Sequence, residues 1–329
     1  MRTALVRSLL VVAGVAVTLL GLEAGLRLRP SDDLPLNDPY QFTRLEGVRQ
    51  FRTPLHSYRE VYPLAFERDG YYARTDGAVD YHFDQLGGRW IAPRARDLGG
   101  RVGLALGDSF TLGFGIRYDD AYLFQAEQAL PGRHVVNLAE PGSDTRRSLA
   151  TYLAVADAQP HDLVLYGLHL NDLIHFPTSA VAMSGWRTGT APGGSRLIGF
   201  VRRTLARRAE RQAMIAEIVD PAQRDRPLFR DNLAAIEALQ REATARGARF
   251  VVVLLPILVD LREGTFEPVY AEIRQALAER KIEVIDLSRV LDGRDSDYWI
   301  LPFDQHPNAR ANEVFGREVA RALVPKPVE

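Results

Sequence analysis

The chain has 329 residues, of which 46% are hydrophobic and 25% charged, enough to bury a sizeable core in one large domain or two ordinary ones. Its 41 Lys and Arg residues nearly balance its 42 Asp and Glu residues, and a net charge of −1 argues against a nucleic-acid binder that works by bulk charge. The lack of cysteine excludes disulfides, thiolate metal sites and a cysteine nucleophile.

The N-terminal segment differs from the rest of the chain. Residues 8–22 are all apolar or small, and if Arg7 and Glu23 extend their charged ends out of the hydrocarbon, residues 4–26 are long enough to span a bilayer. We therefore expect residues 1–29 to form a retained signal anchor, a single transmembrane helix with a cytoplasmic N-terminus and an extracytoplasmic remainder. Two alternatives stay open. A signal peptide could be cleaved to leave a secreted protein, although no clean small-x-small site follows, or the segment could be a buried soluble helix.

Residues 30–100 are rich in Pro, Tyr, Asp and Arg and lack a long helical period. Within them, residues 79–83 alternate apolar and polar side chains as a strand does, and Gly87-Gly88 is typical of a turn. We expect an irregular, partly β lead-in that packs against the main domain.

From residue 101 onward, apolar runs of strand length alternate with helical patterns. The expected strands are residues 102–106, 134–138, 163–168, 250–255 and 282–287. The expected helices are residues 119–130, 144–158, 230–246, 267–280 and 309–323. Continuous β-branched runs between helices predict buried parallel strands covered on both faces. We expect residues 101–325 to form an α/β domain, a three-layer α/β/α sandwich with a five-stranded, mostly parallel sheet.

An insertion at residues 173–227 interrupts this alternation. It opens with a loop rich in Gly, Ser, Thr and Pro, and residues 196–219 then have the pattern of a basic helix. Its arginines include Arg202, Arg203, Arg207, Arg208 and Arg211. Three interpretations remain open: a lid over the active site, a patch that rests on an anionic membrane, or a plain surface helix with a solvated charged face.

Four polar segments follow a strand or open a helix at what should be one edge of the sheet. They are Gly107-Asp108-Ser109-Phe110, residues 137–143 ending in Gly142-Ser143, residues 167–172 ending in Asn171-Asp172, and Asp304-Gln305-His306. Ligands of parallel α/β sheets bind beyond the carboxyl ends of the strands. A serine there can present its hydroxyl at a helix entrance, where backbone N–H groups face developing negative charge.

In order and spacing, these segments resemble the four blocks of the SGNH (GDSL) hydrolase family, and the resemblance covers residues 101–323. It implies an SGNH/flavodoxin-like fold in which Ser109 is the nucleophile, His306 takes its proton and Asp304 orients His306. It also implies an oxyanion hole made of the backbone N–H groups of Ser109 and Gly142 and the side-chain amide of Asn171. No metal or organic cofactor is required.

Two details depart from the family pattern. Its last block is most often Asp-x-x-His, whereas here one residue separates Asp304 from His306; residues two apart still share a side in extended backbone. The third block is longer than usual, because two residues, His169 and Leu170, separate Gly167-Leu168 from Asn171. We expect His169 to share a strand face with Asn171, either packed or lining the pocket. Asp172 is either a substitute triad acid or the cap of the following turn.

The leading interpretation is a membrane-anchored serine esterase that removes acyl groups, most simply O-acetyl groups, from cell-surface or secreted carbohydrate. An O-acyltransferase with the same residues, a lipase or thioesterase, and a catalytically silent anchored scaffold remain alternatives. The expected partners are an acyl-ester substrate and the membrane, without nucleic acid.

Overall fold

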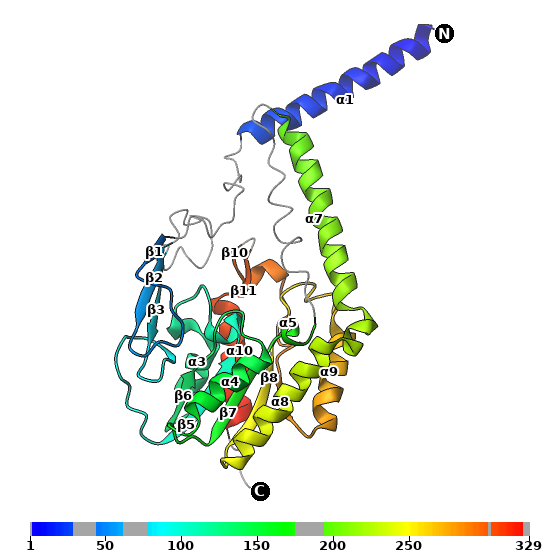
Figure 1. Cartoon of the computed structure of the whole chain (residues 1–329). Helices are drawn as coiled ribbons and strands as arrows, with labels where there is room; N and C mark the ends of the chain where they lie inside the picture. Colours follow the sequence, from blue (N-terminus) through cyan, green and yellow to red (C-terminus); the bar gives the residue numbers. More distant parts are fainter. Residues whose placement is uncertain (1, 29–43, 62–77, 175–193, 302–303, 325–329) are drawn as a thin grey trace. The chain divides into compact units, whose positions relative to one another are not determined.

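The computed structural model describes residues 2–28, 44–61, 78–174, 194–301 and 304–324 (Figure 1). By its internal contacts the chain divides into two compact units. The first comprises Met1–Phe42 with Phe176–Glu217, and the second comprises Thr43–His175 with Ile218–Glu329. Each unit is described by itself below. The loop that opens the predicted insertion and much of the early lead-in lie outside the described residues.

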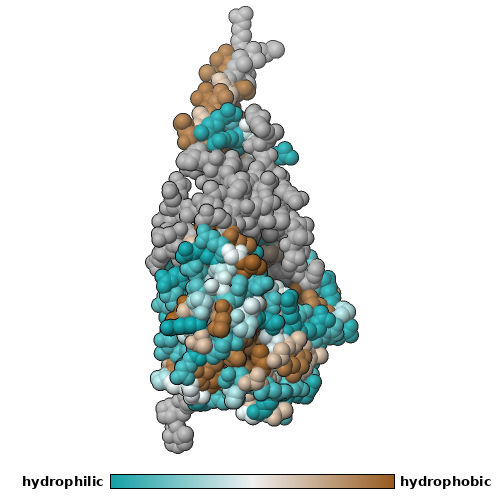
Figure 2. Space-filling view, turned by 60° about the vertical axis from the view of Figure 1, so that its left-hand side comes forward, coloured by the Kyte–Doolittle hydropathy of each residue, from teal (hydrophilic) through white to brown (hydrophobic). Residues whose placement is uncertain are grey.

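The first unit is built from two long helices, α1 (Arg2–Leu28) and α7 (Arg196–Ile218). The last residue of α7, Ile218, belongs to the second unit. Helix α1 is long and apolar enough to cross a membrane, since its 27 residues extend about 40 Å at 1.5 Å per residue. Nearly all of its described apolar side chains are exposed, Leu26 being half-buried, and Figure 2 shows them gathered along the helix. Within its own unit, α1 is therefore not packed as a core helix.

The second unit contains, among its described residues, one nine-stranded sheet. From edge to edge the strands are β1 (Arg44–Glu46), β2 (Ser57–Val61), β3 (Ala78–Phe83), β4 (Arg89–Trp90), β6 (Arg133–Asn137), β5 (Arg101–Gly107), β7 (Leu163–Leu168), β8 (Arg249–Leu254) and β9 (Glu283–Asp286). Strands β5 to β9 are parallel, which confirms the predicted strands. The sheet is larger than predicted because the antiparallel lead-in strands β1 to β4 join β6 through the pair Arg89–Asn137.

Helices cover both faces of the parallel strands, as expected. The main ones are α3 (Tyr122–Gln128), α4 (Thr145–Val155), α8 (Pro227–Ala245), α9 (Glu267–Glu279) and α10 (Ala309–Leu323). Helix α3 packs against α10, while α4 packs against α8, which also contacts β8 (Figure 1). The predicted helix at residues 119–130 is split into a 3-10 turn, η3 (Tyr118–Asp120), and α3.

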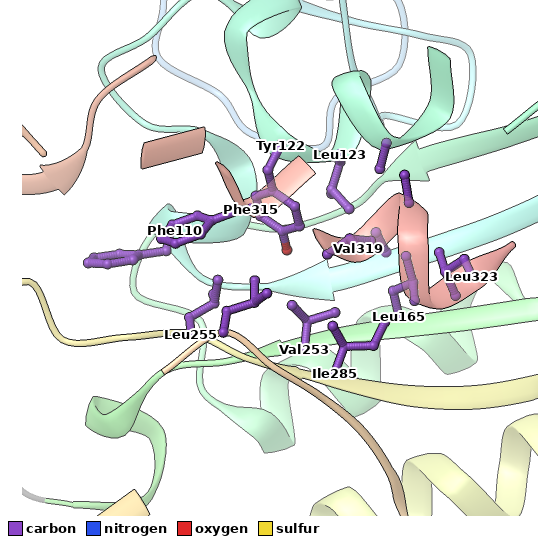
Figure 3. Close-up of a cluster of buried hydrophobic side chains, with 14 of the residues drawn as sticks. Phe110, Tyr122, Leu123, Leu165, Val253, Leu255, Ile285, Phe315, Val319 and Leu323 are labelled. Carbon is purple, nitrogen blue, oxygen red and sulfur yellow. The ribbon is translucent and has the colours of Figure 1, made fainter. Parts of the chain in front are cut away.

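The core between α3, α10 and the sheet also holds the start of the short helix α2 (Ser109–Leu112). Figure 3 shows Phe110 in one cluster with Tyr122 of α3, Phe315 of α10 and apolar strand residues such as Val253. Because α10 begins just after the segment that contains His306, one packed core supports two of the predicted site segments. Burial of each large apolar side chain there contributes about 1.5–3 kcal/mol of transfer free energy.

Candidate active site

Ser109 is the first residue of α2, directly beyond the carboxyl end of β5. The preceding residue, Asp108, caps this helix, since its Oδ1 accepts a hydrogen bond from the backbone N–H of Phe110 at 2.9 Å. Gly107 makes the sharp exit from the strand at a φ of +145°, and a Cβ there would lie 2.5 Å from Thr111 Oγ1. The Gly-Asp-Ser string is thus a close turn followed by a helix cap and a serine at the helix start.

The structure brings Ser109, His306 and Asp304 into direct contact. His306 Nε2 lies 2.9 Å from Ser109 Oγ, and His306 Nδ1 lies 2.5 Å from Asp304 Oδ1. Asp304 and His306 belong to the strand β11 (Asp304–Pro307), which pairs with β10 (Trp299–Leu301). Extended backbone puts residues two apart on one side, so the unusual spacing still forms a pair. The His306 backbone N–H also donates to Asp304 Oδ1 at 3.0 Å.

The surroundings of His306 raise its pKa above the usual value near 6.5. Burial alone would lower that pKa, but the charge of Asp304, its hydrogen bond and the more remote charge of Asp108 favour the imidazolium. Two aromatic rings contact the imidazole, with centroid distances of 5.5 Å for Phe110 and 5.0 Å for Phe114. The imidazole is therefore held by hydrogen bonds at both nitrogens and by aromatic packing.

Gly142 lies in the turn after β6, with a φ of +71° that favours glycine. Among the described residues, none has an atom within 4 Å of a Cβ built at this position, so the space beside it is open with respect to them. The turn closes through the Ser143 N–H, which donates to the Glu140 carbonyl at 3.0 Å. The Glu140 N–H in turn donates to the Gly107 carbonyl at 3.1 Å, which ties the turn to the end of β5.

Asn171 lies in the short helix α5 (Leu170–Leu173) beyond the carboxyl end of β7 and is exposed. Its Nδ2 donates to Asp108 Oδ2 at 3.4 Å, so the structure brings the third block beside the residue that precedes Ser109. Asp108 thus accepts hydrogen bonds from Phe110 of its own block and from Asn171 of the third block, a role that the sequence reasoning missed. The available signal was its position, since Asp directly before a short helix is a common N-cap.

The expectation that His169 and Asn171 share a strand face is wrong. Strand β7 ends at Leu168, and His169 is the N-cap of α5, so the two residues lie on a helical turn. The buried His169 ring packs on Phe110 with centroids 4.2 Å apart, and burial lowers its pKa. This contact joins α5 to the segment that contains Ser109.

Asp172 is a cap within α5 and has no place in the Ser109–His306 chain of contacts. Its Oδ2 accepts hydrogen bonds from the Tyr166 hydroxyl at 2.9 Å and from the His169 N–H at 3.3 Å. Burial, reinforced by the charge of Asp108, raises its pKa well above the usual value. Of the two interpretations of Asp172, capping of the turn is therefore the one that the contacts fit.

Arg89 of β4 is a second residue that the sequence reasoning missed. Its fully buried guanidinium donates to the carbonyls of Leu112 at 2.9 Å, of Ile116 at 2.6 Å and of Gly113. These carbonyls belong to the end of α2 and the turn that follows it. The lead-in thereby supports the helix that begins at Ser109. No sequence signal marks this arginine, because its partners are backbone atoms distant in the chain.

Within the described parts of the chain, no group of three or more His, Asp or Glu side chains is arranged to hold a metal ion. The contacts described above instead form a hydrogen-bonded path from a carboxylate through an imidazole to a hydroxyl. Such a path can activate the hydroxyl as a nucleophile.

The chain matches a known family over residues 105–314, more than half of its length, and that family is the GDSL-like Lipase/Acylhydrolase family. Comparison with curated proteins finds no match. Solved structures similar to the chain include a lipase/acylhydrolase from Enterococcus faecalis, with 14% identity, a TM-score of 0.43 and coverage of 70% of this chain and 99% of that one.

Two further similar structures come from other bacteria. A member of the lipolytic protein G-D-S-L family from Veillonella parvula DSM 2008 has 15% identity and a TM-score of 0.41, with 69% of this chain and 100% of that one covered. The psychrotrophic esterase EstA from Pseudoalteromonas sp. has 13% identity and a TM-score of 0.41, with 68% and 96% covered. At such identities the assignment rests on the family model. The chain belongs to the GDSL-like lipase/acylhydrolase family and is an ester hydrolase of the SGNH type.

Proposed function

We propose that the protein hydrolyses acyl esters through an acyl-enzyme intermediate on Ser109, with His306 as the general base and Asp304 as its partner. The observation that carries this proposal is the unbroken contact path, 2.9 Å from Ser109 Oγ to His306 Nε2 and 2.5 Å from His306 Nδ1 to Asp304 Oδ1. The Ser109–His306 distance lies within the range of hydrogen bonds that move protons in catalysis, and the short contact with Asp304 holds the imidazole in place for that transfer.

The chemistry follows from the two ring nitrogens of His306. Nε2 takes the Ser109 proton as Oγ attacks the ester carbonyl, and the Asp304 carboxylate stabilises the imidazolium that forms. His306 then returns the proton to the departing alkoxide, which leaves the acyl group on Ser109. A water molecule, deprotonated in the same way, attacks the acyl group and releases the carboxylic acid and free serine.

The negative charge on the carbonyl oxygen of the tetrahedral intermediate needs nearby donors. We assign them to the backbone N–H groups of Ser109 and Gly142 and to the side-chain amide of Asn171. The open space beside Gly142 and the exposed position of Asn171 support this assignment. Loss of one such donor typically lowers kcat by about a hundred- to a thousandfold.

For the substrate we propose short acyl groups, O-acetyl in particular, on cell-surface or secreted carbohydrate. Gly142 and Asn171 are both exposed, which supports a site that an ester on a bulky carbohydrate can approach from solvent. The length and apolar composition of α1 support retention at a membrane. We place the second unit on the extracytoplasmic side as part of the same proposal.

Labelling with a fluorophosphonate probe tests the nucleophile. We expect the intact chain to be labelled at Ser109, because the probe reacts with activated serine hydroxyls. The variant Ser109→Ala should lose labelling and lose esterase activity on a soluble acetyl ester by about a thousandfold or more. Ser57→Ala, which removes an exposed serine on β2, is the control that should retain both. Labelling that persists in Ser109→Ala would refute the assignment.

Product analysis then separates hydrolysis from transfer. Incubation with an acetyl donor and an oligosaccharide acceptor should release free acetate in proportion to the donor consumed. Acetylated oligosaccharide in place of free acetate would instead show that the sugar, and not water, attacks the acyl-enzyme. The protein would then be a transferase with Ser109 in the same role.

A further inference from the structure

The first part of α7 exposes large apolar side chains. Ile198, Phe200, Val201 and Leu205 are between 46% and 62% exposed. Val201 and Leu205 are four residues apart, and Ile198 lies three residues before Val201, so these three share one face of the helix. An exposed apolar cluster of this kind on a helix indicates a contact surface.

The same part of the helix is strongly basic. No acidic residue occurs from Arg196 to Ala209, whereas the sequence there has arginine at 196, 202, 203, 207 and 208. The side chains of Arg202 and Arg208 are exposed. Apolar side chains on one face with arginines beside them are typical of a helix that lies in a membrane interface.

The N-terminus of α7 is joined to the C-terminal end of α1, where the two helices diverge (Figure 1). The carboxylate of Glu23 accepts hydrogen bonds from the backbone N–H groups of Arg196 at 3.0 Å and Leu197 at 2.8 Å, and from the Ser195 hydroxyl at 2.8 Å. The first N–H groups of a helix lack partners within the helix, so Glu23 satisfies donors that would otherwise need water. Arg196 also donates to the Leu26 carbonyl at 3.1 Å.

This junction fixes the depth, relative to the bilayer, at which α7 begins. The uninterrupted apolar stretch of α1 ends at Leu22, so Glu23 marks the boundary between hydrocarbon and headgroups. A helix that begins at Glu23 therefore begins at that boundary.

We propose that residues 196–208, about three and a half turns of α7, lie on the membrane surface beside the anchor and bind anionic phospholipid. The side chains of Ile198, Val201 and Leu205 enter the boundary of the acyl chains, and Arg202 and Arg208 face lipid phosphates. This inference rests on the proposed anchoring by α1. A second copy of the chain is a poorer occupant, because two such faces would bring like charges together.

The lack of native cysteine makes spin labelling at single cysteines direct. The full chain is placed in phosphatidylcholine nanodiscs with or without phosphatidylglycerol, with labels introduced by Ile198→Cys, Leu205→Cys, Ala213→Cys or Val15→Cys. Collision with oxygen, which concentrates in the bilayer, is compared with collision with a water-soluble nickel chelate. Val15 reports on α1, and the exposed Ala213 is the matched control farther along α7.

We expect the labels at 198 and 205 to be accessible to oxygen and protected from the chelate, the label at 213 to show the reverse, and phosphatidylglycerol to increase the difference. The double variant Arg202→Gln/Arg208→Gln should reduce this dependence on phosphatidylglycerol. Each arginine lost should lower the partition constant of the segment on an anionic surface by about fivefold.

Accessibility at 198 and 205 equal to that at 213, with Val15 protected, would overturn the inference and leave the anchor intact. Protection at 198 and 205 from both reagents would indicate protein contact and also overturn it. Chelate access at Val15 would overturn the anchor itself.

Discussion

At the scale of single residues, the two ring nitrogens of His306 face different partners. Nδ1 faces the Asp304 carboxylate, which selects the tautomer with its proton on Nδ1 and leaves Nε2 free to accept the proton of Ser109. The same carboxylate opposes the effect of burial and raises the pKa of His306. Asp304 therefore supports both the geometry and the basicity of the imidazole.

A pH profile tests this role. The base must be neutral, so kcat/KM should rise with pH as His306 loses its proton. The midpoint of this rising limb should lie above the usual histidine pKa of about 6.5. In Asp304→Asn only the charge of Asp108 still opposes the effect of burial, so the limb should move to lower pH while kcat falls by about 10⁴. The control Asp172→Asn keeps an oxygen for Tyr166 and His169 and should leave the limb in place. An unshifted limb in Asp304→Asn would contradict the assignment.

The raised pKa of His306 also has a consequence for stability. A histidine whose pKa is higher in the folded chain stabilises the fold fully below its unfolded pKa, and this contribution is lost as pH rises through the folded pKa. The contribution of His306 to stability is therefore expected to be largest at the pH values where the site is least active, because the imidazolium that Asp304 favours cannot serve as a base.

At the scale of elements, the helix that begins at Ser109 depends on the lead-in strand β4. Arg89 donates to three carbonyls at the end of α2 and beyond, and its guanidinium lies 4.3 Å from the centroid of the Tyr81 ring. The sequence predicted a β-rich lead-in packed on the main domain, but not that it joins the sheet or reaches the candidate site. Strand pairing between distant segments leaves no local pattern, which is why this part could not be predicted.

Substitution of Arg89 tests this support. Arg89→Met removes the guanidinium donors from three carbonyls in the core, so we expect a loss of roughly 3 kcal/mol in the free energy of unfolding and a fall in kcat. Arg101→Met on β5 is the matched control, because Arg101 forms an exposed ion pair with Asp162 and such pairs contribute about 0–1 kcal/mol. Urea unfolding and esterase kinetics measure both effects. Equal losses in the two variants would show that Arg89 gives no specific support.

At the scale of the whole molecule, every residue of the candidate site belongs to the second unit, whereas the apolar helix α1 and nearly all of α7 belong to the first. Catalysis and membrane attachment are therefore expected to separate. Ile218, the last residue of α7, already belongs to the second unit and is buried.

Truncation of residues 1–42 tests this separation. The shortened chain should unfold cooperatively, hydrolyse a soluble acetyl ester with kcat/KM comparable to that of the full chain, and no longer partition into uncharged phosphatidylcholine membranes. A folded but inactive truncated chain would indicate that the first unit contributes to the site. Sedimentation with vesicles, circular dichroism and ester kinetics provide the three measurements.

The sequence by itself determined the parallel strands, the helices between them and the four polar segments, because periodicity and turn chemistry are local and each strand end is marked by its own residues. It also determined the apolar N-terminal helix. Only the tertiary structure decided that extended backbone pairs Asp304 with His306, that Asp172 caps α5, and that Arg89 supports the end of α2. The first two contacts depend on the local direction of the backbone, and the third joins segments distant in the chain. Backbone direction and burial are both set only once the chain is folded.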